Sequence, residues 1–111
     1  MANIYKNEKV DLTTSNTTTL YTVPSNSRAI VKALLVAEDA GTGAQITATL
    51  VNANSDIFML FSNKAVSGNE TLQLLTEPLI MLENEILKVK ANNADKLHVI
   101  ASILEINRED V

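Results

Sequence analysis

Hydrophobic and polar residues alternate along much of the chain with a period of two, which is the spacing of a half-buried β-strand. The clearest case is 45–50, where Ile46, Ala48 and Leu50 alternate with Gln and Thr. Leu87 and Val89 repeat the pattern between lysines. Short polar connections rich in Asn, Ser, Gly and Pro bound these segments, as expected of turns. The pattern predicts further strands at 9–12, 20–23, 57–61 and 97–106.

Two segments admit more than one interpretation. Residues 28–38 form an almost continuous apolar run whose Ala and Leu content would also suit a helix. The run lacks the polar stripe of an amphipathic helix and ends at the flexible sequence Ala40-Gly41-Thr42-Gly43, so we interpret it as a strand. Residues 71–76 and 79–82 flank Glu77-Pro78 and fit either two strands or one strand bent at the proline.

The spacing of the predicted strands indicates one all-β domain. The 111 residues suit a single hydrophobic core. Roughly eight short strands joined by tight turns are typical of a single antiparallel β-sandwich or jelly roll. We expect this domain to comprise residues 10–111. Residues 1–9 are polar and charged, and we expect them to form an extended N-terminal arm that adds a strand to a neighbour's sheet.

Two predicted strands, 30–36 and 99–106, are apolar on both faces, although each sheet of an antiparallel sandwich meets water on one side. Either loops lie over these outer faces or another copy of the chain covers them. We favour a second copy, because a free monomer would otherwise expose a large apolar patch. The residues expected at such interfaces are Ile4, Tyr5, Ile57, Phe58, Phe61, His98, Ile100 and Leu104.

Composition argues against several kinds of chemistry. The chain has no cysteine, and its one histidine, His98, lies inside the final apolar strand, which argues against a catalytic triad and leaves no zinc ligand set. His98 is therefore expected to be a strand or interface residue, and we expect no catalytic residue, metal ligand or cofactor. A net charge of -4 provides no basic surface for nucleic acid. No segment has the roughly 18 consecutive apolar residues of a membrane span, so no membrane partner is expected.

The order of segments resembles that of small virion proteins of tailed bacteriophages, particularly those infecting marine bacteria and cyanobacteria. The resemblance is carried by Thr18-Thr19-Leu20-Tyr21-Thr22-Val23-Pro24, by 28–36, by Glu77-Pro78-Leu79 with Leu82-Glu83-Asn84-Glu85, and by 103–105. The chain departs from the more usual pattern at Asn84-Glu85, where a Gly-Asp turn is commoner.

This resemblance implies a non-enzymatic structural protein of a virion that is made in the host cytoplasm. The expected role is an oligomeric capsid decoration or cement protein, a homotrimer that contacts the major capsid protein or other virion proteins. The alternative is a tail or fibre component, either a host-recognition module or a tail or neck adaptor.

Overall fold

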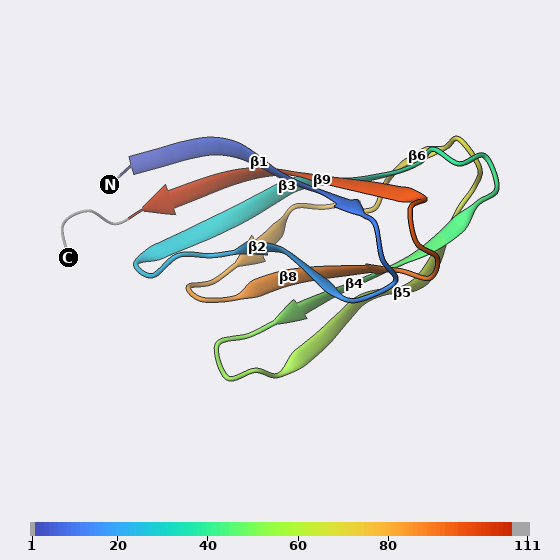
Figure 1. Ribbon diagram of the computed structural model, residues 1–111. Helices are drawn as coiled ribbons and strands as arrows, with labels where there is room; N and C mark the ends of the chain where they lie inside the picture. The colour runs from blue at the N-terminus through green and yellow to red at the C-terminus, as the bar shows by residue number, and fades with distance from the viewer. Residues whose placement is uncertain (1, 108–111) are drawn as a thin grey trace.

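The computed structural model describes residues 2–107, which fold into a two-layered β-sandwich that contains no helix within this range (Figure 1). Nine strands occur in these residues: β1 Ala2–Leu12, β2 Thr18–Thr22, β3 Ser27–Glu38, β4 Ala44–Val51, β5 Ile57–Val66, β6 Thr71–Gln73, β7 Leu79–Met81, β8 Ile86–Ala91 and β9 Leu97–Asn107. The all-β sandwich predicted from the sequence is thereby confirmed.

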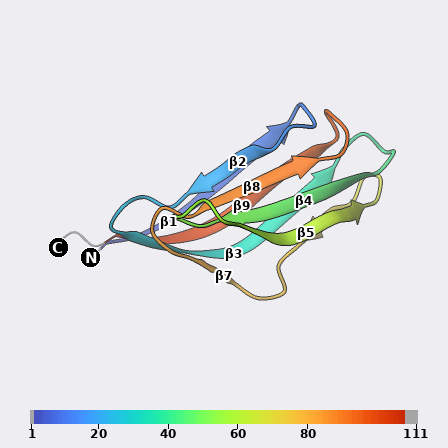
Figure 2. The same ribbon diagram turned by 90° about the horizontal axis from the view of Figure 1, so that it is seen from below.

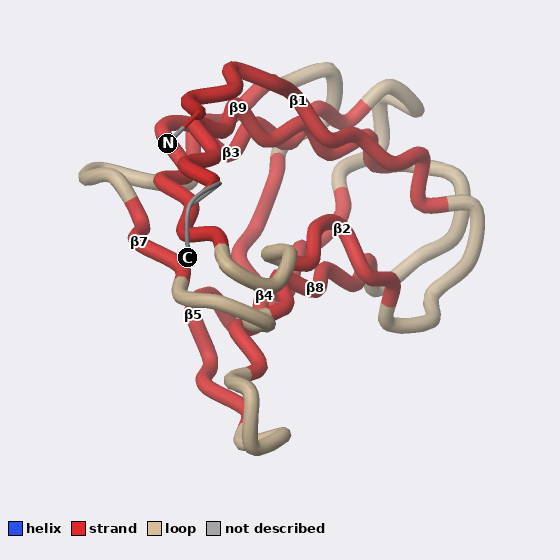
Figure 3. The backbone as a smooth tube through the Cα atoms, turned by 90° about the vertical axis from the view of Figure 1, so that its left-hand side faces the viewer, coloured by secondary structure: helices blue, strands red, loops and turns tan. Residues whose placement is uncertain are grey.

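Each layer is one antiparallel sheet. The five-stranded sheet has the order β1-β9-β3, and β3 then pairs with β6 near one end and with β7 near the other. The four-stranded sheet has the order β2-β8-β4-β5. Seen end-on in Figure 3, the two sheets lie one above the other, and the β4–β5 hairpin extends beyond the layers, away from the five-stranded sheet. The outer face of the four-stranded sheet is turned toward the viewer in Figure 2.

The core is aliphatic because the chain has few aromatic residues. Every second side chain of the central strands points between the sheets and is buried, as the alternating pattern of β9 illustrates. The five-stranded sheet contributes Val31, Leu34, Val36, Val99, Ala101 and Ile103, and the four-stranded sheet contributes Ile46, Ala48, Leu87, Val89 and Ala91. Removing this surface from water is the main stabilising term, at about 25 cal/mol per Å² of apolar area.

The structure decides between the interpretations that the sequence left open. Residues 28–38 belong to a strand, β3, and not to a helix. The segments on either side of Pro78 are two separate strands, β6 and β7, which pair with successive parts of β3. Asn84 adopts a φ of 66° in the turn before β8. Asparagine tolerates this left-handed conformation, so the turn keeps a geometry that glycine also favours.

The sequence-based boundary places the start of the domain at residue 10, but residues 2–9 do not stand apart from the domain. They are the first part of β1, which pairs with β9 of the same chain from Ala2↔Asn107 to Leu12↔Leu97. The alternation of polar residues such as Lys6 and Glu8 hides this strand in the sequence. At a sheet edge, however, polar side chains reach water from both faces, so a strand there needs no apolar pattern.

A buried carboxylate organises the loops at one end of the sandwich. Glu38 accepts hydrogen bonds from the backbone N–H groups of Gly41, Thr42 and Gly43 at 2.8, 3.2 and 2.7 Å, and from that of Asn69 at 3.1 Å. Burial by itself raises the pKa of Glu38, but these four donors outweigh burial and lower the pKa to about 2. The ionised carboxylate therefore holds the β3–β4 and β5–β6 connections together.

Candidate interaction surface

An apolar row crosses the outer face of the five-stranded sheet. Tyr5 of β1 lies opposite Leu104 of β9, Leu104 lies opposite Ile30 of β3, and Ile30 lies opposite Ile80 of β7. Residues directly opposite each other in antiparallel strands point to the same face. Their sequence neighbours Ala29, Met81, Ile103 and Glu105 are buried, so the row faces outward. Tyr5 and Ile80, at its two ends, are 75% and 64% exposed. We call these four residues the outer apolar row.

Further apolar side chains extend this face toward the other end of the sheet. Ile100 of β9 lies between Leu35 of β3 and Lys9 of β1 and is exposed. The ammonium group of Lys32 lies 5.9 Å from the centre of the Tyr5 ring, within the range of a cation–π contact. A charged group of β3 thus reaches across β9 to the β1 end of the row.

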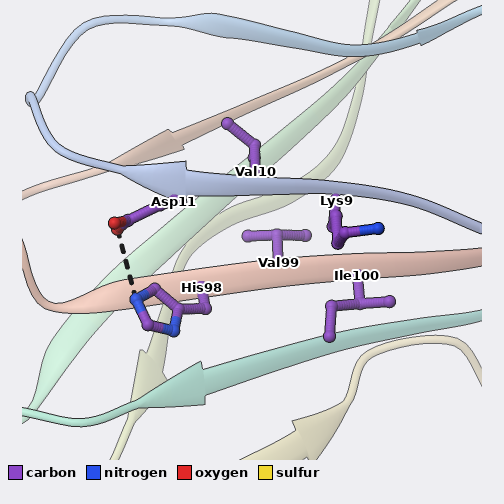
Figure 4. Close-up of a pocket in the computed structure, with 6 residues that line it drawn as sticks. All are labelled: Lys9, Val10, Asp11, His98, Val99 and Ile100. Atoms are coloured by element: carbon purple, nitrogen blue, oxygen red, sulfur yellow. Dashed lines mark ion pairs between the residues drawn. The ribbon is translucent and has the colours of Figure 1, made fainter.

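His98 lies at the polar end of the same face. Its Nε2 atom is 3.2 Å from Oδ1 of Asp11 and 3.6 Å from Oδ2 of Asp39, and its side chain is about half exposed. Figure 4 shows the contact with Asp11 beside a hollow of about 330 Å³. The lining residues are Lys9, Val10, Asp11, His98, Val99 and Ile100. The two carboxylates flank the imidazole at the rim of the apolar surface.

A hydrogen bond between the sheets supports the outer apolar row from below. Glu105 follows Leu104 on β9 and points inward, where the Tyr21 hydroxyl of β2 donates a 2.6 Å hydrogen bond to it. The Lys6 ammonium group lies 3.8 Å from the Glu105 carboxylate and 5.4 Å from the centre of the Tyr21 ring. Burial raises the pKa of the Tyr21 phenol, and its hydrogen bond to Glu105 and the charge of Glu105 raise it further. Tyr21 thus remains a donor that ties the two sheets together.

A second apolar surface lies at the free edge of the four-stranded sheet. Three consecutive residues of β5, Ile57, Phe58 and Met59, are exposed on the hairpin that extends from the sandwich (Figure 3). The turn before them is rigid, because the side-chain oxygen of Asn52 accepts hydrogen bonds from the backbone N–H groups of Asn54 and Asp56. We call the three β5 residues the hairpin patch.

The interface residues expected from the sequence therefore separate into two groups. Tyr5, His98, Ile100 and Leu104 share the outer face of the five-stranded sheet, whereas Ile57 and Phe58 belong to the hairpin patch. Two expected residues lie elsewhere. Ile4 is paired with the inward-facing Glu105 and so points to the opposite face of β1. Phe61 is partly buried against the core.

Sequence reasoning missed two members of the outer apolar row. Ile30 sits in a run without polar alternation, so no pattern distinguishes its outward side chain from the inward ones. Ile80 belongs to a strand of three residues close to Pro78. Its pairing with Ile30 joins residues far apart in the sequence, which a local pattern does not reveal.

Within 2–107, no three or more His, Cys, Asp or Glu side chains are grouped so as to hold a metal ion. The same part of the chain has no helix long and apolar enough to cross a membrane.

No family model and no curated protein matches the sequence. Solved structures do match the fold. A chain of the T13 particle of infectious bursal disease virus superposes with a TM-score of 0.59 at 9% identity, over 94% of this chain and 30% of the viral one. For a mutant VP2 protein of that virus, in derived T=1 particles, the TM-score is 0.51 at 9% identity, over 94% of this chain and 31% of the VP2 chain. For a pentameric capsid protein from metagenomic phage sequences, the TM-score is 0.43 at 18% identity, over 93% of this chain and 60% of the capsid protein.

The similarities to the two infectious bursal disease virus chains establish a shared fold. The chain spans less than a third of the length of the two infectious bursal disease virus chains, so it corresponds to one part of them. Virus particle proteins are thus among the known proteins that use this β-sandwich.

Proposed function

We propose that this protein is a non-enzymatic structural component of a virus particle, and specifically an oligomeric capsid decoration or cement protein. The observation that carries the proposal is the outer apolar row, Tyr5-Leu104-Ile30-Ile80, whose two ends are mostly exposed. A monomer leaves this surface in water at a cost of about 25 cal/mol per Å², which self-association recovers.

In the proposed assembly, three copies bury their outer apolar rows together in a homotrimer. The hairpin patch projects from the opposite sheet and is left to contact the major capsid protein. Because the two contacts use separate surfaces, one protein binds both its own copies and the shell. Weak contacts of this kind gain strength through multiplicity, because each trimer binds the shell at several points at once. The fold shared with virus particle proteins agrees with this role.

The test is the mass of the purified chain in solution, measured by light scattering over a range of concentrations. The proposal predicts a species of three times the chain mass that dissociates on dilution. A chain that stays monomeric up to millimolar concentration would contradict it. The hairpin patch is tested separately by mixing with particles of a parent virus stripped of accessory proteins. Replacement of Phe58 by Ser should then reduce binding to particles and leave the trimer intact.

A further inference from the structure

β1 forms an open edge of the five-stranded sheet. It pairs with β9 along all 11 of its residues, and no other strand of residues 2–107 pairs with its second side. An unpaired edge of this length exposes a row of backbone N–H and C=O groups that another strand can join. Charged residues on an edge ordinarily hinder such joining, so the placement of Lys6, Glu8 and Lys9 decides which partners fit.

The sequence of β1 is self-complementary in one antiparallel register. When two identical strands pair about a two-fold axis normal to the sheet, one residue lies opposite its own copy and the others pair symmetrically around it. Centring the axis on Lys6 or on Glu8 places like charges opposite each other, which is destabilising. Centring it on Asn7 places Lys6 opposite Glu8 twice. The charges thus oppose the two neighbouring registers and favour the central one.

The remaining pairs of the Asn7 register are also compatible. On the face with Lys6 and Glu8, Ile4 lies opposite Val10. On the outer face, Tyr5 lies opposite Lys9, which suits a cation–π contact, and Asn3 lies opposite Asp11, which suits a hydrogen bond. Asn7 is also the midpoint of Ala2–Leu12, so every residue of β1 finds a partner.

We propose that β1 pairs antiparallel with β1 of a second copy of this chain, about a two-fold axis at Asn7. The five-stranded sheets of the two copies then form one continuous sheet, and their outer faces lie side by side. Because the contact uses the strand edge and engages only Tyr5 of the outer apolar row, at one end of that row, it can link two trimers. A two-fold contact combined with a three-fold contact extends an assembly of one kind of subunit beyond the trimer.

Disulfide trapping tests the register, because the natural chain has no cysteine. In the Asn7→Cys variant the two cysteines of a pair lie directly opposite, with Cβ atoms about 4.5–5.5 Å apart, close enough to link with little adjustment. Asn3→Cys is the matched control, since Asn3 is exposed on the same face of the same strand. Its own copy lies eight residues away along the pair, or about 27 Å. With oxidised glutathione, Asn7→Cys should form covalent dimers at least tenfold faster than Asn3→Cys.

Equal rates for the two variants, or no dimer from folded Asn7→Cys, would overturn the proposal. A second variant checks the charge argument. Glu8→Lys places a lysine opposite Lys6 of the second copy and should slow trapping of an Asn7→Cys background about tenfold, because two attractive pairs become repulsive. An unchanged trapping rate in a folded Glu8→Lys protein, judged by circular dichroism, would also count against the register. The outer apolar row is intact in all of these variants, so trimer formation can succeed when edge pairing fails.

Discussion

The outer faces of the two sheets offer a direct comparison, because each carries a row of four residues across four strands. In the five-stranded sheet the row is Tyr5, Leu104, Ile30 and Ile80. In the four-stranded sheet the row is Thr19, Lys88, Thr49 and Met59. The rows are alike in place and strand number, and they differ in chemistry. One row is apolar throughout, whereas the other consists of two threonines, a lysine and a terminal methionine.

The polar row shows how this fold makes an outer face that suits water. Threonine keeps the β-branched shape that strands favour and adds a hydroxyl group, and lysine extends its charge into solvent over its own apolar stem. The outer apolar row contains neither threonine nor lysine. The difference indicates that the two rows meet different surroundings, solvent for the row through Lys88 and another protein surface for the outer apolar row.

The largest expected effect comes from placing a charge in each row. Ile80 and Met59 are matched, since each lies at the end of its row and they are 64% and 57% exposed. Ile80→Lys should weaken self-association about 10- to 100-fold, because burial of an isoleucine side chain contributes about 1.5–3 kcal/mol. Met59→Lys should leave self-association unchanged. Sedimentation equilibrium measures both, and equal effects of the two substitutions would remove the distinction between the faces.

A smaller effect is expected from the support beneath the outer apolar row. Tyr21→Phe removes the donor to the buried Glu105 carboxylate and should lower the free energy of unfolding by about 1–3 kcal/mol. Tyr5→Phe removes a hydroxyl group from the other tyrosine, which is mostly exposed, and should change the free energy of unfolding little. Urea denaturation of the two variants provides the measurement. A Tyr21→Phe protein as stable as the Tyr5→Phe protein would show that the inter-sheet hydrogen bond is dispensable.

The smallest effect concerns acid stability of the loops that join the faces. The folded-state pKa of Glu38, about 2, lies below the ordinary value of 4.5. Its contribution to stability is therefore complete above pH 4.5 and disappears as the pH falls toward 2. Glu38→Gln should be less stable than the natural protein at pH 7. This difference in the free energy of unfolding should shrink as the pH falls from 4.5 to 2. Glu83→Gln, at an exposed site, is the control. A gap independent of pH would contradict the assigned role of the carboxylate.

The sequence predicted those parts of the fold in which local pattern and tertiary position agree. Ile46, Ala48 and Leu50 alternate strictly because β4 has one face toward the core and one toward water. The doubly apolar runs of β3 and β9 likewise predicted an apolar outer face. The beginning of β1 was missed because an edge strand needs no apolar alternation, so Lys6 and Glu8 resemble a loop in sequence.

The composition of the candidate surface was harder to predict, because it depends on which strands become neighbours. Tyr5 and Ile80 belong to one surface only through the pairing of β1 with β9, of β9 with β3, and of β3 with β7. Local spacing carries no information about these long-range pairings. In β5, the projecting hairpin leaves Ile57, Phe58 and Met59 exposed together, although a run of apolar residues ordinarily marks a buried strand.

The most direct test of the central claim is to follow the solvent accessibility of the two faces as the protein associates. Ile80→Cys and Met59→Cys each introduce the only cysteine of the chain, and the rate of thiol modification reports how exposed that position is. We expect the rate at position 80 to fall as protein concentration rises, while the rate at position 59 stays constant. Rates that are independent of concentration at both positions, or that fall equally at both, would contradict the claim that the outer apolar row is the self-association surface.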